Sequence, residues 1–139
     1  MKKLITAIVA IMIAATLAFG MTACGASPEE KLKNFVESDT FQSQVDAQKA
    51  SLGSTLDLDV KVEGSNLIYE CIYKTQISED LVENVKTQLD TAFNSMSSTY
   101  ESIANELKSD LKLENPVVIV RILNADNTTI TEYKFEATE

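Results

Sequence analysis

Cysteines and carboxylates are the residues of this chain that could do chemistry by type and spacing. The 139 residues include two cysteines and 21 acidic residues, but no histidine and no tryptophan. No serine or cysteine has an obvious base beside it, and the four glycines form no phosphate-binding loop. Carboxylates alone can catalyse hydrolysis, but none of them lies in a motif that singles it out. We therefore expect no enzymatic activity, no metal site and no cofactor.

The first cysteine follows a segment that is typical of an export signal. Lys2 and Lys3 open the chain, residues 4–20 are mostly apolar, and Cys24 follows shortly after them. A positive start, an apolar stretch and an exit of small residues define a secretory signal. The apolar run is marginal for a permanent membrane span, which needs about 20 residues, and no cluster of positive charge follows it. We expect residues 1–23 to be removed.

The residues around this cut, Met21-Thr22-Ala23-Cys24, resemble the bacterial lipobox. The resemblance implies that signal peptidase II cuts before Cys24 once its thiol carries a diacylglycerol. Two acyl chains give the stable anchoring that one chain cannot give. This predicts a protein held by lipid at the extracellular face of the cell membrane. The alternative is an ordinary signal peptide cut after Gly20 or Ala23, which leaves a soluble protein with a free thiol.

The charge balance limits the partners of the chain. There are 12 basic and 21 acidic residues, a net charge of -9. Removing Lys2 and Lys3 leaves 10 basic residues against 21 acidic ones, a net charge of -11. Nucleic acid and bare anionic membrane are disfavoured partners for such a chain. Its length suits a single domain, which we place at residues 28–139 after a short lipid-anchored linker at residues 24–27.

The first half of this domain has the pattern of two helical segments followed by a hairpin. Ser27-Pro28-Glu29-Glu30 predicts a helix start, because it combines a capping box with proline at the first helical position. The apolar stripe that follows is interrupted at residues 38–40, where a second N-cap could start a new segment. Residues 56–63 alternate apolar and charged side chains, as in a half-buried strand. Gly64-Ser65 predicts a tight turn, and residues 66–74 form the returning strand.

The second half starts with an unusually long helical pattern. About 30 residues after Ser78 would make a helix of roughly 45 Å, whereas a strand of eight residues spans only about 26 Å. Either the helix overhangs the sheet and pairs with the N-terminal helices, or it bends near residues 94–99, where helix propensity is low. We favour pairing, with a possible bend. A second hairpin follows, with strands at residues 117–123 and 129–136 and turn residues at 124–127.

The order of these elements is α-ββ-α-ββ. It predicts an α+β fold in which a four-stranded, mainly antiparallel sheet has its helices packed on one face. The pattern does not fix the order of the strands in the sheet.

Three further features could bind or react, and each has a simpler interpretation. Asp57 and Asp59 share one side of a strand and could bind a hard cation, but calcium normally needs six or more oxygens, so we interpret them as a solvated strand face. Asp126 resembles part of a calcium loop, and we interpret it as a turn residue. Cys71 could be a reactive thiol, but its tyrosine neighbours at two-residue spacing favour packing in the core.

An excess of apolar residues on the sheet indicates a surface that could bind a partner. If one side of each strand faces the helices, the other side carries apolar side chains among the charged ones of Asp59, Glu70, Arg121 and Glu132. Such a mixed patch could bind a protein or a cell-envelope component. The simpler interpretation is that β-branched residues stabilise strands and that scattered exposed apolar residues are ordinary. The residues of this candidate face are Ile68, Ile72, Ile119, Arg121, Leu123 and Ile130.

Together with the lipobox-like start, four segments resemble a family of small Gram-positive lipoproteins that carry a domain of unknown function. They are SDTFQSQV at 38–45, TQIS at 75–78, NPVVIVR at 115–121 and LNAD at 123–126. The resemblance covers nearly all of the chain after Cys24 and implies no catalytic or ligand residues. Asp126-Asn127 stands where the family often has Asp-Gly, and asparagine tolerates the same left-handed conformation.

From these observations we expect a membrane-anchored, non-enzymatic domain that binds a protein or a cell-envelope component. The alternative is an accessory lipoprotein that binds a small molecule or a cation.

Overall fold

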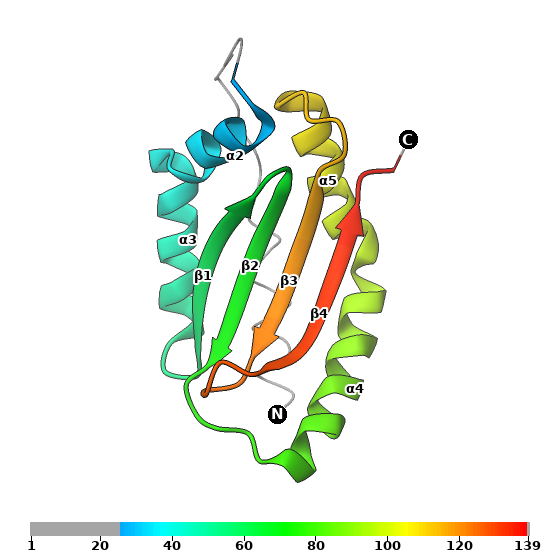
Figure 1. The fold of residues 1–139 in the computed structure, drawn as a ribbon. Helices are drawn as coiled ribbons and strands as arrows, with labels where there is room; N and C mark the ends of the chain where they lie inside the picture. The colour runs from blue at the N-terminus through cyan, green and yellow to red at the C-terminus, as the bar shows by residue number, and fades with distance from the viewer. Residues whose placement is uncertain (1–25, 139) are drawn as a thin grey trace.

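The computed structural model of the protein describes residues 26–138, and its elements follow the predicted order. A helix pair and a hairpin are followed by a second helix pair and a second hairpin, as Figure 1 shows. The predicted α+β class, with helices packed against a four-stranded sheet, is therefore confirmed. The elements are α2 (Pro28–Val36), α3 (Asp39–Leu52), β1 (Leu56–Glu63), β2 (Asn66–Tyr73), α4 (Glu79–Ser95), α5 (Ser97–Asp110), β3 (Val117–Leu123) and β4 (Thr129–Glu136).

Side-chain caps start the first two helices where the sequence predicts them. Ser27 Oγ accepts a hydrogen bond from the Glu30 backbone N–H, and the Glu30 carboxylate accepts one from the Ser27 N–H. Ser38 Oγ caps α3 by accepting from the Phe41 N–H at 3.4 Å. Each cap satisfies N–H groups that have no partner inside the helix. These contacts confirm the predicted interruption between the two helical segments.

The long helix that was predicted after Ser78 is broken at Met96. α4 ends at Ser95, α5 begins at Ser97, and Met96 between them has φ -116° and ψ 9°, outside the helical region. The possible bend is therefore confirmed, whereas α4 and α5 make no extensive contact with α2 or α3, so the favoured pairing with the N-terminal helices is wrong. α3 packs on β1, whereas α4 and α5 pack on β3 and β4 (Figure 1). The break falls in a run of serine residues, whose side chains compete for backbone hydrogen bonds.

The sheet has the strand order β1-β2-β3-β4. β1 pairs with β2 and β3 pairs with β4 in antiparallel hairpins, whereas β2 and β3 run parallel in the centre. A parallel pair cannot be joined by a tight turn and needs a long crossover connection. α4 and α5 supply that connection, so the second helix pair is a consequence of the central pairing.

Alternate residues of every strand face the helices and form one core. Leu58, Tyr69, Val120 and Phe135 all belong to this buried cluster, together with apolar residues of all four helices. Cys71 is also part of it, and burial raises the pKa of its thiol to about 12. The predicted core role of this cysteine is confirmed, because reactivity needs a thiolate.

Among residues 26–138, none of the helices has the length and the hydropathy of a membrane span.

Four aromatic rings connect the second helix pair to the edge strand β4. Phe93 of α4 stacks on Tyr133 with ring centroids 4.3 Å apart, and Tyr100 of α5 stacks on Phe135 at 4.5 Å. Phe93 and Tyr100 lie 5.5 Å apart across the helix break. The Tyr133 hydroxyl donates to Asp90 Oδ1 at 2.6 Å. The Tyr100 hydroxyl, in contrast, is fully buried and has no hydrogen-bond partner in the described chain.

The unpaired Tyr100 hydroxyl gives a stability prediction. A buried hydroxyl without a partner costs about 1–3 kcal/mol, so Tyr100→Phe is expected to raise the free energy of unfolding by about 1 kcal/mol. Tyr133→Phe is the matched control, because it removes a hydroxyl that is paired with Asp90, and it should lower stability by about 1 kcal/mol. Urea unfolding of the two variants measures both changes. A loss of stability in Tyr100→Phe would show that this hydroxyl has a partner.

Candidate functional site

The candidate site is the outer face of the sheet, which is the face turned away from the helices. Strand alternation places apolar and charged side chains on it in rows that cross all four strands. One row joins Lys61, Ile68, Ile119 and Lys134 in register. Although no core helix covers this face, Ile68 is only 1% exposed and Ile119 only 6%. The aliphatic parts of the Lys61 and Lys134 side chains, on the two edge strands, can cover these central residues.

A network of alternating charges forms the next row and is the main electrostatic feature of the outer face. Glu70 on β2 pairs with Lys61 on β1 and, at 3.3 Å, with Arg121 Nη1 on β3. Arg121 Nε also contacts Glu132 Oε2 on β4 at 2.7 Å, and Lys134 Nζ lies 3.5 Å from Glu132 Oε1. The network therefore contains three cations and two anions, and it connects all four strands.

Glu70 is the buried centre of this network. Glu70 is only 5% exposed, so an unpaired charge there would be costly. Burial raises the pKa of the Glu70 carboxyl, but its ion pairs with Lys61 and Arg121 outweigh that effect and hold the pKa below its usual 4.5. The hydrogen bond from Arg121 likewise lowers the pKa of Glu132. Both carboxylates are thus held in the charged form.

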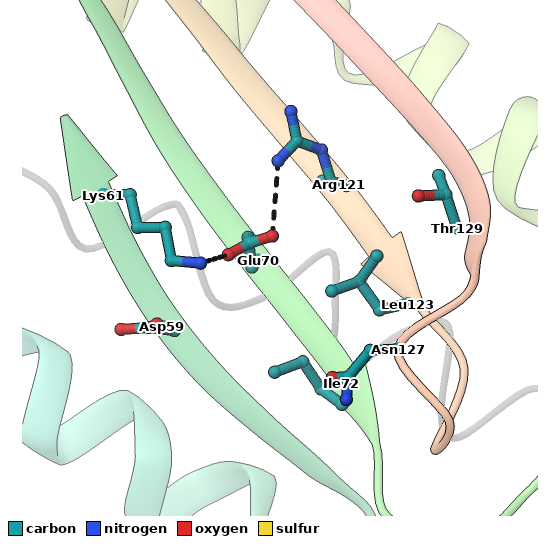
Figure 2. Close-up of a pocket in the computed structure, with 8 residues that line it drawn as sticks. All are labelled: Asp59, Lys61, Glu70, Ile72, Arg121, Leu123, Asn127 and Thr129. Atoms are coloured by element: carbon teal, nitrogen blue, oxygen red, sulfur yellow. Dashed lines mark hydrogen bonds and ion pairs between the residues drawn. The ribbon is translucent and has the colours of Figure 1, made fainter. Parts of the chain in front are cut away.

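Beside the network lies a hollow with a volume of about 500 Å³. Its charged side chains are those of Asp59, Lys61, Glu70 and Arg121, so it shares three residues with the network. Figure 2 shows that these side chains come from β1, β2 and β3 and that the Glu70 carboxylate lies between Lys61 and Arg121. The remaining lining residues are Ile72, Leu123, Asn127 and Thr129.

The turn that borders the hollow is fastened by a buried asparagine. Asn124 accepts a hydrogen bond from the Ile77 N–H at 2.8 Å and donates one to the Ile77 carbonyl at 2.9 Å. Gln76 and Asp126 make a similar reciprocal pair through one side-chain and one backbone contact. Asn127 then adopts a left-handed φ of 65°, as the sequence predicts. The TQIS and LNAD segments thus contact each other and fix the end of the hollow.

The structure brings together five of the six residues that the sequence placed on the candidate face. Three of them, Ile72, Arg121 and Leu123, line the hollow, and Ile68 and Ile119 lie beside it in the next row. Ile130 is the exception and must be corrected, because it packs in the core with the helices. A register shift causes this: Ile122 pairs with Thr131 and Leu123 pairs with Thr129, so Ile130 is left without a partner.

Sequence reasoning assigned only part of the polar lining of the hollow. Alternation placed Asp59, Glu70 and Arg121 on the outer face, but the ion pairs among the strands follow only from the strand order. Asn127 and Thr129 belong to a turn and a strand start, and no sequence pattern connects them to β1 or β2. Their position follows from the two hydrogen bonds between the Asn124 side chain and the Ile77 backbone, which we call the Asn124 clamp.

The cation-binding alternatives have no cluster of ligands in the described chain. Within residues 26–138, no three His, Cys, Asp or Glu side chains lie together as a metal site. Asp57 and Asp59 each accept a hydrogen bond from the backbone N–H of the next residue. Asp126 accepts from the Thr128 N–H and hydroxyl, which is the hydrogen bonding of a turn. The predicted lipidation residue, Cys24, lies outside the described residues.

Residues 32–135 match a family that is described only as a domain of unknown function, DUF4854. This match spans well over half of the chain. The chain belongs to the DUF4854 family. No curated protein and no solved structure matches it. Membership therefore adds no ligand or reaction to this DUF4854 domain, and the outer face has to be interpreted from its own residues.

The charge network predicts how the stability of the DUF4854 domain depends on pH. Because the folded pKa of Glu70 is lowered, its charged form stabilises the fold above about pH 4.5, and this contribution is lost as the pH falls through the folded pKa. Glu70→Gln should therefore lower the free energy of unfolding at pH 7 by about 2–3 kcal/mol and flatten its decrease between pH 5 and pH 3.

Urea unfolding across this pH range measures the effect. Glu63→Gln is the matched control, because Glu63 lies on the same face but is exposed and has no ion pair with a described residue. If Glu70→Gln keeps the wild-type pH dependence, Glu70 is not held by the network.

Proposed function

We propose that the protein is a small Gram-positive lipoprotein whose extracytoplasmic domain binds a protein or a cell-envelope component through its outer sheet face. In this proposal the domain is not an enzyme. Residues 1–23 are the export signal, and Cys24 carries the lipid. The lipobox-like residues Met21-Thr22-Ala23-Cys24 support the anchor, and the hollow beside the charge network is the single observation that supports the binding site.

The place of the hollow in the fold fits this function. The described chain starts at Ala26, and α2 lies at the end of the sheet that carries the β1–β2 turn, where Glu29 contacts the Gly64 backbone (Figure 1). Lys61 is three residues before Gly64 along β1, so the hollow begins about 10 Å from that end. Asn127 lies at the opposite end, in the turn between β3 and β4. A lipid on Cys24 would hold the first end near the bilayer and leave the hollow accessible.

The second candidate function is binding of a small molecule by an accessory lipoprotein. The volume of the hollow favours it, because about 500 Å³ falls within the range of small-molecule sites. The cation version of this alternative has no comparable support among the described residues. A protein partner would cover both the hollow and the row around Ile68 and Ile119, whereas a small molecule would occupy the hollow alone.

The anchor is tested by Cys24→Ser in the full-length chain. We expect this variant to leave the membrane fraction and to remain uncleaved or to be cut elsewhere, because serine has no thiol to accept the lipid. Cell fractionation and mass spectrometry of the N-terminus measure both changes. Cys71→Ser is the matched control and should stay lipid-anchored. An unchanged membrane fraction together with unchanged maturation of Cys24→Ser would contradict the lipoprotein assignment.

The binding face is tested by Ile72→Asp, because Ile72 is half-buried in the hollow and its change leaves the helix-side core intact. Pull-down from native membranes should recover partners with the wild-type protein and lose them with this variant. Leu81→Asp is the control: Leu81 is 42% exposed on α4 and away from the outer face. Circular dichroism checks that both variants fold. Identical capture by folded Ile72→Asp and wild type would exclude the outer face.

A further inference from the structure

Resting on the proposed binding function, we infer that the hollow binds a peptide end: a free carboxylate at Lys61 and Arg121, with a small apolar side chain on Ile72 and Leu123. This assigns a chemical class to the ligand and a role to each part of the lining. The carboxylate, the amide groups and the apolar side chain of such a ligand each meet a different set of residues.

The donors for the carboxylate are groups that the network leaves available. Arg121 uses Nε for Glu132 and Nη1 for Glu70, and its Nη2 makes no hydrogen bond with residues 26–138. The side chain of Lys61 is 52% exposed and pairs only with Glu70 in the described chain. Since Glu70 holds both cations beside it, they are positioned before a ligand arrives. Guanidinium and ammonium groups form charge-assisted hydrogen bonds with carboxylates.

The charges around the hollow favour a singly charged ligand over a doubly charged one. Lys61 and Arg121 line the hollow together with the carboxylates of Asp59 and Glu70, so its lining carries no net charge. Both cations can contact a carboxylate, but a phosphate dianion would bring a second negative charge close to Asp59 and Glu70. The net charge of -9 on the whole chain disfavours a dianion as well.

Neutral polar groups at the far side of the hollow suit peptide amides. Neither the Asn127 side-chain amide nor the Thr129 hydroxyl has a hydrogen-bond partner in the part of the chain that the structure describes, and both residues are exposed. Asparagine can donate and accept at once, as a peptide group requires. The turn that carries Asn127 is held by the hydrogen bonds between Asn124 and Ile77, so the backbone from which the Asn127 side chain extends is fixed.

The apolar part of the lining is the reason why we expect the ligand to carry a small apolar side chain. Ile72 and Leu123 are paired in register across β2 and β3, and both line the hollow. An inorganic anion would leave this apolar surface exposed, whereas an alanine-sized side chain would cover it. The volume of about 500 Å³ leaves room for two or three residues of an extended chain.

The probe is N-acetyl-Ala-Ala with a free carboxylate, titrated into protein made from the full-length chain and measured by calorimetry. The same peptide with a C-terminal amide should bind at least about tenfold more weakly, because it lacks the charge. Lys61→Gln should also weaken binding of the free-acid peptide by about tenfold or more. Lys134→Gln is the matched control, since Lys134 also pairs with a glutamate on the outer face but does not line the hollow, and it should bind as wild type.

The stereochemistry of the probe distinguishes two sources of such an end. Proteins end in L-residues, whereas peptides of the bacterial cell wall end in D-alanine. Tighter binding of the L,L or of the D,D form would support the inference and identify the source. Equal binding of acid and amide, equal binding of inorganic phosphate, or no effect of Lys61→Gln would overturn it.

The inference and the proposed function can fail separately. If no peptide binds but Ile72→Asp still abolishes partner capture, the outer face binds something other than a peptide end, and only the inference is wrong. If Ile72→Asp has no effect on either measurement, the proposed site itself is wrong.

Discussion

The parallel pairing of β2 with β3 is the constraint on which the rest of the structure depends. Two antiparallel hairpins could fold as separate units. The parallel pairing of β2 with β3, which we call the parallel seam, needs a long crossover connection, and α4 and α5 provide it. The same seam places the ends of β2 and β3 at one edge of the sheet, where Asn124 holds the Ile77 backbone. It also sets Glu70 opposite Arg121 and Ile72 opposite Leu123. The core, the clamp and the hollow therefore all follow from one strand pairing.

Local sequence predicted nearly all elements of this fold, because caps, turns and alternation are local signals. The strand at Leu56–Glu63 and the left-handed Asn127 are found as expected. The break at Met96 was predicted only as a possible bend, since propensity alone did not decide between a bend and helix pairing. Strand order is a long-range property that no local pattern encodes, and the position of Ile130 depends on a one-residue register shift. The candidate face was therefore predicted in Arg121 and in its apolar residues other than Ile130, whereas the hollow itself was not predicted.

The outer face combines features that a purely structural sheet surface does not need. Scattered exposed β-branched residues are ordinary, but a nearly buried glutamate held by two cations is costly to assemble. Replacement of such a network by apolar residues is often neutral or stabilising, so its presence favours a role in specificity over one in stability. The helix side of the sheet shows the opposite character, with a buried Cys71 and stacked rings of Phe93 and Tyr133. This contrast between the two faces is the physical basis of the proposed function.

The central claim is that the Glu70–Arg121 ion pair joins the two hairpins across the parallel seam and shapes the hollow. A double-mutant cycle with Glu70→Gln, Arg121→Gln and the double variant measures this interaction most directly, through the free energy of unfolding at pH 7. We expect a favourable coupling energy of about 1–3 kcal/mol, because both side chains are largely shielded from solvent and hydrogen-bonded to each other. Additive effects of the two substitutions, with no coupling, would contradict it.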